Sequence, residues 1–299
     1  MPPTRLGLIG AGRWGRFYVN TIKDLPEATL AAVASANPTT PAYVGADCSV
    51  FTRWQELLDT TEIDGLVFAT SPIQQVEIAK AAILRGLAIL MEKPVSLLVD
   101  DADELVRLAQ SNRAITHVDH IDLNNPALCA LREHIADPSD VRGLHGTWSN
   151  QGPVRTFMRG LWDYGAHATA VCLDIMGRAP DSLEASWVRH GADGELARLR
   201  LSWSGPVAVL EVGNAATGST RCLEIQTSQH LLRYDDLADH KAYVDGREIA
   251  HPATRPLTCA VQRFVAAIRR GSNDYRDLEL GASVVRTLAA AQRILEQEN

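Results

Sequence analysis

The sequence predicts an α/β protein in which a doubly wound, mostly parallel sheet is followed by a second α/β domain rich in antiparallel strands. Three observations predict this class. A glycine-rich turn near the N-terminus joins a short apolar run to a helix-compatible segment. Strand-like and helix-like segments then alternate over roughly the first 118 residues. From residue 182 onward, β-like runs recur between Gly, Asp and Pro turns, as in a meander.

Composition narrows the class of protein. The 299 residues suffice for two cores, and the 46% apolar and 22% charged content is ordinary for a globular chain. A net charge of −7 argues against a nucleic-acid partner, and no apolar stretch reaches the length of about 20 residues that a membrane span needs. The first strand begins within five residues of Met1, leaving no room for a signal peptide. The five scattered cysteines form no CxxC motif, so we expect reduced thiols and a cytoplasmic location.

The glycine turn predicts a dinucleotide site. An apolar run at 6–9 leads into Gly10-Ala-Gly12-Arg13-Trp14-Gly15, and a helix follows over 16–25, ended by Pro26. In this context Gly10 permits the tight turn, Gly12 lets backbone N–H groups approach a pyrophosphate, and Gly15 lets the helix pack on its strand. We therefore expect this turn, Arg13 and Trp14 included, to bind the cofactor; a plain glycine turn is the alternative.

The remaining elements of the first half follow in order. Strands are predicted at 29–34, 65–69, 88–91 and 114–118, and helices at 53–58, 73–85 and 96–109. Ligands in such sheets bind at the carboxyl ends of the strands, so Thr70, Ser71 and Pro72 are candidate cofactor contacts. Ser35 and Asn37 follow the second strand, where an NAD site usually has a carboxylate. Ser35 would not repel a 2′-phosphate, which favours NADP over NAD slightly, with help from Arg13 or Asn37.

Glu92-Lys93-Pro94 places a lysine just beyond the predicted strand 88–91. Pro94 disfavours the α-region for Lys93, which is therefore held extended at the edge where a nicotinamide would lie. A partly desolvated lysine there can donate to a ribose or substrate oxygen and exchange a proton. A surface lysine in a turn explains the motif equally well.

A second candidate pair lies in the predicted helix 160–176, which follows a strand at 141–150. Asp163 and His167 are four residues apart and project from one helical face. A carboxylate beside an imidazole suits proton transfer, with Asp163 orienting and His167 relaying. Taken alone, a capping aspartate and an ordinary helix histidine would explain the two residues better.

Together these motifs resemble the Gfo/Idh/MocA family of nicotinamide-dependent oxidoreductases. The resemblance rests on Gly10–Gly15, on Glu92-Lys93-Pro94 and on the segment from Trp162 to His167. It implies an N-terminal Rossmann domain over 1–120 and a C-terminal domain over 121–299, whose large open sheet supports substrate binding and oligomerisation as a homodimer or homotetramer. It also implies Lys93, Asp163 and His167 as the catalytic set, with Glu92 beside the cofactor.

Position by position, the chain departs from the family pattern. Leu123 stands where an arginine is common, Ala170 where an acidic residue is common, and Val76 where a histidine is common. These departures affect the identity of the substrate more than the type of reaction.

The histidines near the predicted domain junction suggest a possible metal-binding site. Along one strand, the side chains of His117 and Asp119 would point to one face of the sheet, and those of His120 and Asp122 to the other. Neither face would then hold enough ligands for a metal ion. We predict no metal. His120 could line the cleft or be structural, and Arg155, Arg159 and Trp162 are candidate substrate residues by position.

The sequence thus predicts hydride transfer between a nicotinamide and a hydroxyl-bearing carbon of a small sugar, cyclitol or related polyol. His167 is the first candidate for the acid–base group, and Lys93 is nearly as good. Two alternatives remain: a non-catalytic NAD(P)-binding regulator, and an NAD-dependent glycosidase.

Overall fold

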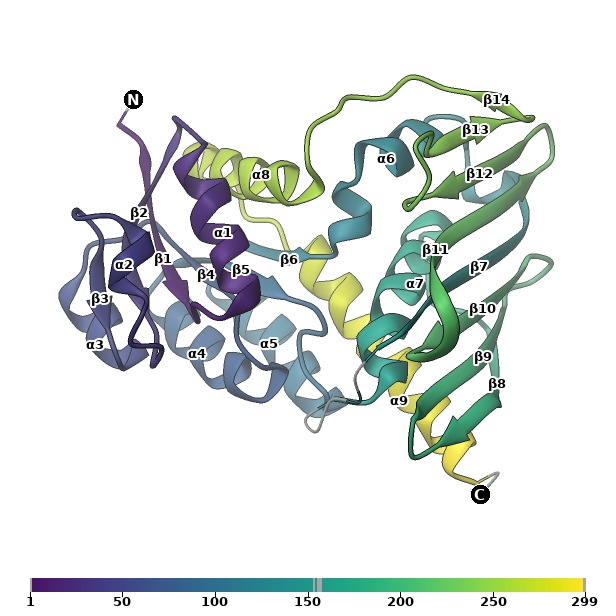
Figure 1. Cartoon of the computed structure of the whole chain (residues 1–299), viewed down its shortest axis with the longest axis horizontal. Coiled ribbons are helices and arrows are strands. Elements are labelled where there is room, and N and C mark those ends of the chain that lie inside the picture. The colour runs from purple at the N-terminus through teal and green to yellow at the C-terminus, as the bar shows by residue number, and fades with distance from the viewer. Residues whose placement is uncertain (1, 153, 155–157, 298–299) are drawn as a thin grey trace. The chain divides into compact units, whose positions relative to one another are not determined.

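The computed structural model describes residues 2–152, 154 and 158–297, which divide into two compact units (Figure 1). The first comprises Met1–Asp119 and Arg255–Ala282; the second comprises His120–Thr254 and Ser283–Asn299. The sequence predicts one division, between residues 120 and 121; the first unit ends at Asp119, and residues 255–282 return to it. That return follows from packing, because Phe264 and Ile268 lie directly over Gly65 of the first sheet.

The first unit is built on a six-stranded parallel sheet with the order β3-β2-β1-β4-β5-β6. Its strands are β1 (Thr4–Ile9), β2 (Ala28–Ala34), β3 (Ser49–Phe51), β4 (Gly65–Phe68), β5 (Ala88–Glu92) and β6 (Thr116–Asp119). The central strands are buried along their whole length, which explains their continuous apolar runs. The order reverses between β1 and β4, so the loops that follow these two strands meet at one edge of the sheet.

Helices cover both faces of this sheet. They are α1 (Arg13–Lys23), α2 (Pro41–Val44), α3 (Trp54–Thr60), α4 (Pro72–Leu84), α5 (Val99–Ser111) and α8 (Pro256–Arg270). In Figure 1, α1 and α8 lie together on one face, and α4 and α5 lie together on the other. This is the doubly wound arrangement that the alternation of elements predicts. The helix α1 begins three residues earlier than predicted because Gly12 already acts as its N-cap.

The second unit contains an eight-stranded sheet with the order β14-β13-β12-β11-β7-β10-β9-β8. Its strands are β7 (Val141–Gln151), β8 (Ser182–Gly191), β9 (Gly194–Ser202), β10 (Val207–Gly213), β11 (Ala215–Thr227), β12 (Leu231–Asp235), β13 (Ala242–Val244) and β14 (Arg247–Glu248). The β7–β10 pair is parallel, and the other described pairs are antiparallel. The mainly antiparallel sheet is confirmed, but β7 lies between β10 and β11 and interrupts the meander.

One face of this sheet packs against a long buried helix, α7 (Gly160–Met176). Shorter elements complete the unit: η1 (Ile121–Asn124), α6 (Pro126–Arg132) and η2 (Pro138–Asp140). The last helix, α9 (Arg276–Gln297), gives its first turns to the first unit and the rest to the second. Gly165 of α7 leaves room for Leu288 of α9. Among the residues that the structure describes, no helix is long and apolar enough to cross a membrane.

Candidate active site

The glycines of the turn between β1 and α1 have two different roles, one in the fold and one in binding a ligand. Gly10 has a φ of +89°, and a Cβ on it would lie 2.4 Å from the Ala69 carbonyl oxygen. A Cβ on Gly15 would lie 2.2 Å from the Gly10 carbonyl oxygen. Both positions therefore require glycine for the fold itself. A Cβ on Gly12 would meet nothing within 4 Å, so the backbone at the start of α1 faces open space. That space suits a pyrophosphate held by the N–H groups of the helix.

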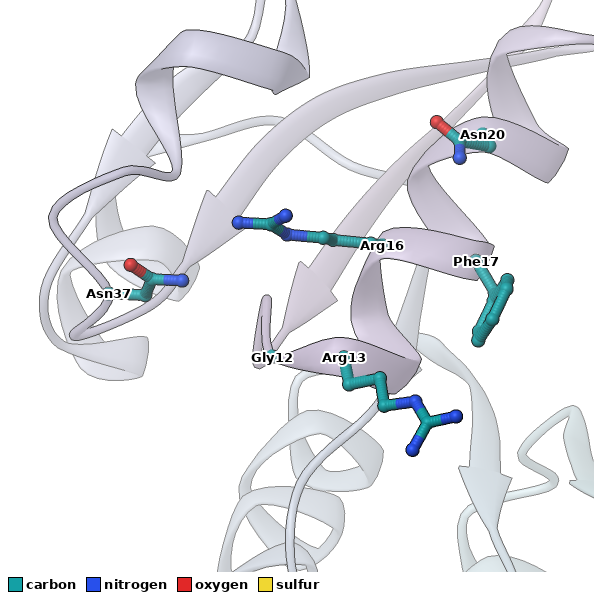
Figure 2. A pocket seen from close by; sticks show the side chains of 6 residues that line it. All are labelled: Gly12, Arg13, Arg16, Phe17, Asn20 and Asn37. Carbon is teal, nitrogen blue, oxygen red and sulfur yellow. The ribbon is translucent and has the colours of Figure 1, made fainter.

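A pocket of about 420 Å³ opens beside this turn (Figure 2). Its lining residues are Gly12, Arg13, Arg16, Phe17, Asn20 and Asn37. Figure 2 shows Arg16 extending from α1 toward Asn37, whereas Arg13 points away from that residue. The sequence offers Arg13 or Asn37 as the residue that favours a 2′-phosphate. In the structure the arginine that faces Asn37 is Arg16, which no sequence motif singles out.

The loop after β2 is organised by hydrogen bonds around Ser35 and Asn37. The Ser35 hydroxyl accepts from the Asn37 N–H at 3.1 Å, and the Asn37 Oδ1 accepts from the Thr39 N–H at 3.1 Å. Arg16 donates to the Thr39 hydroxyl at 3.2 Å, and its guanidinium lies 4.4 Å from the centre of the Tyr43 ring. The arginine is therefore held over this loop by a hydrogen bond and a cation–π contact.

The loop after β4 continues the same edge. Ser71 is the N-cap of α4, and Pro72 is its first residue. The Thr70 hydroxyl donates to the Gln74 side chain at 2.8 Å. These residues follow β4, the strand next to β1, and so lie at the same edge of the sheet as the glycine turn.

Lys93 follows the last residue of β5 and is bracketed by Gln75 of α4. The Gln75 side chain donates to the Glu92 carbonyl oxygen at 3.0 Å and to the Pro94 carbonyl oxygen at 2.6 Å. Gln75 is fully buried, so this clamp fixes the backbone on both sides of Lys93. Glu92 itself accepts hydrogen bonds from Trp14 and Tyr18 of α1. Gln75 and Tyr18 carry no motif that would have identified them from sequence.

In the second unit, His167 is held by Asp122. The His167 Nδ1 lies 2.7 Å from the Asp122 Oδ2, and both side chains are buried. Asp163 shares a helical face with His167, but the carboxylate at hydrogen-bond distance from Nδ1 belongs to η1. Asp122 is therefore a second candidate for the orienting role that the sequence assigns to Asp163. Asp122 was considered in the sequence only as part of a metal site.

The charge on Asp122 is well defined. Burial by itself would raise the pKa of this carboxyl group, but the neighbouring His167 and Arg221 lower it to about 2. The Arg221 Nη1 lies 3.7 Å from the Asp122 Oδ1. Asp122 is therefore ionised at neutral pH and favours a proton on His167 Nδ1, which leaves Nε2 for chemistry.

The remaining predicted site residues fall into different settings. Arg155 lies outside the described residues. Arg159 pairs with Glu195 at 3.0 Å and with Glu296 at 3.4 Å, so its charge is already compensated within the second unit. The indole of Trp162 is buried and donates to the Gln292 side chain at 2.6 Å. His120 is 3% exposed, and its carbonyl oxygen accepts from Leu123 at the start of η1. These contacts are structural, and substrate roles for these residues stay predictions.

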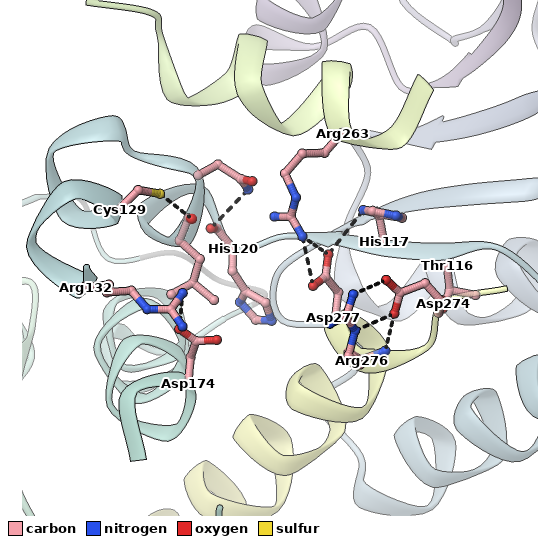
Figure 3. Close-up of polar contacts among 12 residues, drawn as sticks. Thr116, His117, His120, Cys129, Arg132, Asp174, Arg263, Asp274, Arg276 and Asp277 are labelled. Atoms are coloured by element: carbon pink, nitrogen blue, oxygen red, sulfur yellow. Dashed lines mark hydrogen bonds and ion pairs between the residues drawn. The ribbon is translucent and has the colours of Figure 1, made fainter. Parts of the chain in front are cut away.

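The histidine on β6 has a structural partner. In Figure 3 the His117 ring contacts Asp277, with 3.3 Å between Nδ1 and Oδ2, and Arg263 approaches the same carboxylate at 3.4 Å. Across the described part of the chain, no group of three or more His, Cys, Asp or Glu side chains is arranged to hold a metal ion.

Fold and site together define a class of protein. The parallel sheet with its glycine turn is an NAD(P)-binding Rossmann fold, and the second sheet supports a buried Asp–His pair. A family model described as an oxidoreductase family with an NAD-binding Rossmann fold matches residues 4–120. The chain belongs to the Gfo/Idh/MocA oxidoreductase family.

The relatives cover the chain to different extents. A provisionally assigned oxidoreductase from Magnetospirillum magnetotacticum MS-1 has a solved structure that is 34% identical, with a TM-score of 0.90 over 96% of this chain and 99% of that one. UDP-N-acetylglucosamine 3-dehydrogenase of Acidithiobacillus ferrooxidans is 31% identical over 131 residues, 43% of this chain and 41% of that protein. The rhizopine catabolism protein MocA of Rhizobium meliloti is 27% identical over 61% of this chain and 60% of its own length. The matches thus span less than two thirds of these two curated relatives.

Proposed function

We propose that the protein catalyses reversible hydride transfer at a hydroxyl-bearing carbon of a sugar, cyclitol or related polyol. The observation that carries this proposal is the buried pair of His167 and ionised Asp122. A hydroxyl group loses its proton when its carbon gives up a hydride. A histidine whose Nδ1 is fixed by a carboxylate can accept that proton at Nε2.

The residues that would hold the cofactor lie in the first unit. The backbone at Gly12 and the start of α1 would hold the pyrophosphate, and the edges after β4 and β5 would hold the nicotinamide half. The nicotinamide, when bound, supplies the acceptor or donor of the hydride. The open space at Gly12 is the local feature that fits such a group.

The proton has two candidate carriers on this chain. His167, with Asp122 orienting it, takes the hydroxyl proton during oxidation and returns it during reduction. Lys93, whose backbone the Gln75 side chain fixes, would hydrogen-bond a ribose oxygen of the cofactor and is the alternative proton carrier. The reverse assignment, with Lys93 as the main relay, remains open, and so does the orienting role predicted for Asp163.

We further propose a preference for NADP. No carboxylate occurs between Ser35 and Thr40, so nothing in this loop would repel a 2′-phosphate. Arg16 is held above the loop beside Asn37 and Thr39, with its guanidinium positioned by the Tyr43 ring. An arginine presents several N–H donors to phosphate oxygens in a fixed plane.

The substrate class rests on family relatives. One relative, UDP-N-acetylglucosamine 3-dehydrogenase, is named for a sugar-nucleotide substrate. A hydroxyl-bearing carbon of a sugar or polyol is therefore the substrate chemistry that we propose for this chain. An anionic substrate had been considered because of Arg155 and Arg159. Because Arg159 already pairs with Glu195 and Glu296, it no longer supports an anionic substrate.

We also propose that two copies associate through the open face of the eight-stranded sheet. One row of side chains crosses this face in register: Glu184, Arg200, Val209, His145, Glu224 and Arg233. A two-fold axis parallel to the strands, between β10 and β7, would set Glu184 against the partner's Arg233. The same axis would set Arg200 against the partner's Glu224. The charges of this row are therefore complementary to those of the same row in a second copy that is related by the axis.

The test is a turnover screen with NAD⁺ and NADP⁺ across sugars, sugar nucleotides and inositols. Reduction of either cofactor by a polyol, lost in His167→Ala, would support the proposal. Tight cofactor binding without turnover on any polyol would favour the regulatory alternative. Release of sugar from a glycoside without net cofactor consumption would favour the glycosidase.

A further inference from the structure

Two carboxylates lie side by side at the carboxyl edge of the parallel sheet. Glu92 ends β5, Asp119 ends β6, and the two residues are register partners on neighbouring parallel strands. Register partners direct their side chains to the same face of a sheet, which here is the face that α1 covers. Asp119 is 1% exposed. Two acidic groups, of which Asp119 is buried and Glu92 half-buried, are thus brought together.

The hydroxyl group of Tyr18 bridges this pair. It lies 2.8 Å from the Glu92 Oε1 and 2.9 Å from the Asp119 Oδ2, and the tyrosine is fully buried. A phenol carries a single proton and can donate it to only one of these oxygens. Both contacts are full two-centre hydrogen bonds when the other carboxyl group is protonated and donates to the phenol oxygen. The geometry therefore fits one proton in addition to that of Tyr18.

The other groups around the pair act on Glu92 in opposite directions. Glu92 receives hydrogen bonds from the Trp14 indole and the Tyr18 hydroxyl, and it also interacts with the backbone and the charge of Lys93. These contacts favour an ionised Glu92, whereas its burial favours the protonated acid. A consistent chain has one carboxyl group protonated and donating to the Tyr18 oxygen, and the Tyr18 hydroxyl donating to the other carboxylate.

We propose that Glu92 and Asp119 share one proton through Tyr18, and that this shared proton couples the environment of Lys93 to pH. The second half rests on the proposed function of Lys93. With the proton in place, the pair carries one negative charge beside Lys93, and Glu92 is held where it contacts the Lys93 backbone. When the proton leaves for solvent, the pair carries two charges, and Tyr18 can satisfy only one of them.

The electrostatics place this change in a useful range. Burial raises the pKa of Glu92 to about 7, against the opposing effects of Tyr18, Lys93 and Trp14. Two carboxylates in one site lose their protons in steps that belong to the pair. The pair is therefore singly protonated below neutral pH and loses its proton as the pH rises through that value. A second negative charge then acts on the Lys93 ammonium group.

Infrared difference spectroscopy of the full chain, without cofactor or substrate, tests the shared proton. The carboxylic-acid C=O band of a buried acid should be present at pH 6 and fade as the pH rises through about 7. Glu92→Gln and Asp119→Asn should each abolish it, because an amide can donate to Tyr18 without an extra proton. Asp59→Asn, at an exposed carboxylate paired with Arg85, is the control and should leave the band unchanged. Absence of the band in the wild type, or its survival in both amide variants, would overturn the proposal.

The coupling to Lys93 is tested by the pH dependence of kcat/KM. Tyr18→Phe keeps the ring and removes the bridge, and it should move the inflection near neutral pH by about one unit or more. Glu92→Gln serves the same purpose if the Phe variant does not fold. An unchanged inflection in a folded variant would refute the coupling. Because the infrared band needs no turnover, failure to find a polyol substrate would count against the proposed function and leave the shared proton standing.

Discussion

The Nδ1 atom of His167 lies 2.7 Å from the Oδ2 atom of Asp122, a residue 45 positions earlier in the chain. The Asp122 carboxylate thus contacts the imidazole through one oxygen, and its other oxygen, Oδ1, lies 3.7 Å from the Arg221 Nη1. The pair lies wholly within the second unit, so its geometry depends on the packing of η1 against α7.

Replacing Asp122 with Asn should therefore lower kcat by about 10²- to 10⁴-fold, the range of a general acid–base contribution. An amide that donates to Nδ1 would move the imidazole proton to Nε2, where a base is needed. The dissociation constant of the cofactor, measured by fluorescence titration, should change little. Asp163→Asn is the matched comparison: a larger loss of kcat there would return the orienting role to Asp163.

Lys93→Met should abolish measurable turnover with the best substrate while leaving cofactor affinity within a few fold, since the lysine acts on the reacting hydroxyl. Lys80→Met is the control, because Lys80 pairs with Glu104 on helices away from the strand ends. Steady-state kinetics and cofactor titration together decide the matter. Retained turnover in Lys93→Met would end its catalytic role.

Arg16→Ala should raise the KM for NADP⁺ about 10- to 100-fold, the effect of losing one charged hydrogen-bonding partner of a phosphate. The KM for NAD⁺ should change about threefold at most. Arg85→Ala, at an arginine paired with Asp59 on the other side of the sheet, is the control. Equal losses with both cofactors would show that Arg16 supports the fold of the loop rather than reading a phosphate.

Arg200→Glu should weaken self-association through the sheet, because it would oppose the partner's Glu224 with a like charge. Light scattering after size exclusion would report a shift toward monomer. Adding Glu224→Arg restores the complementary order and should restore the assembly. If the double variant stays as weak as the single one, the proposed axis is wrong; if neither change affects the mass, the face is not the interface.

Local sequence patterns predicted much of the fold because they act over a few residues. The apolar runs at 65–68 and 88–91 match the buried β4 and β5, and the glycines of the first turn match the close approaches at Gly10 and Gly15. The short elements α2, β3 and α6 were missed, since three to seven residues carry too little periodicity to stand out. The return of α8 to the first unit was missed for a different reason, namely that it depends on contacts across the whole chain.

The sequence by itself determined the parallel sheet, the dinucleotide turn, the lysine at a strand end and the placement of Asp163 and His167 on one helical face. Each of these follows from residues that are close along the chain. Only the tertiary structure decided that Asp122 holds His167, that Arg16 faces Asn37, and that Tyr18 bridges Glu92 and Asp119. Such contacts join residues far apart along the chain, as much as 101 positions for Tyr18 and Asp119, and side-chain packing sets them rather than any periodicity of the chain.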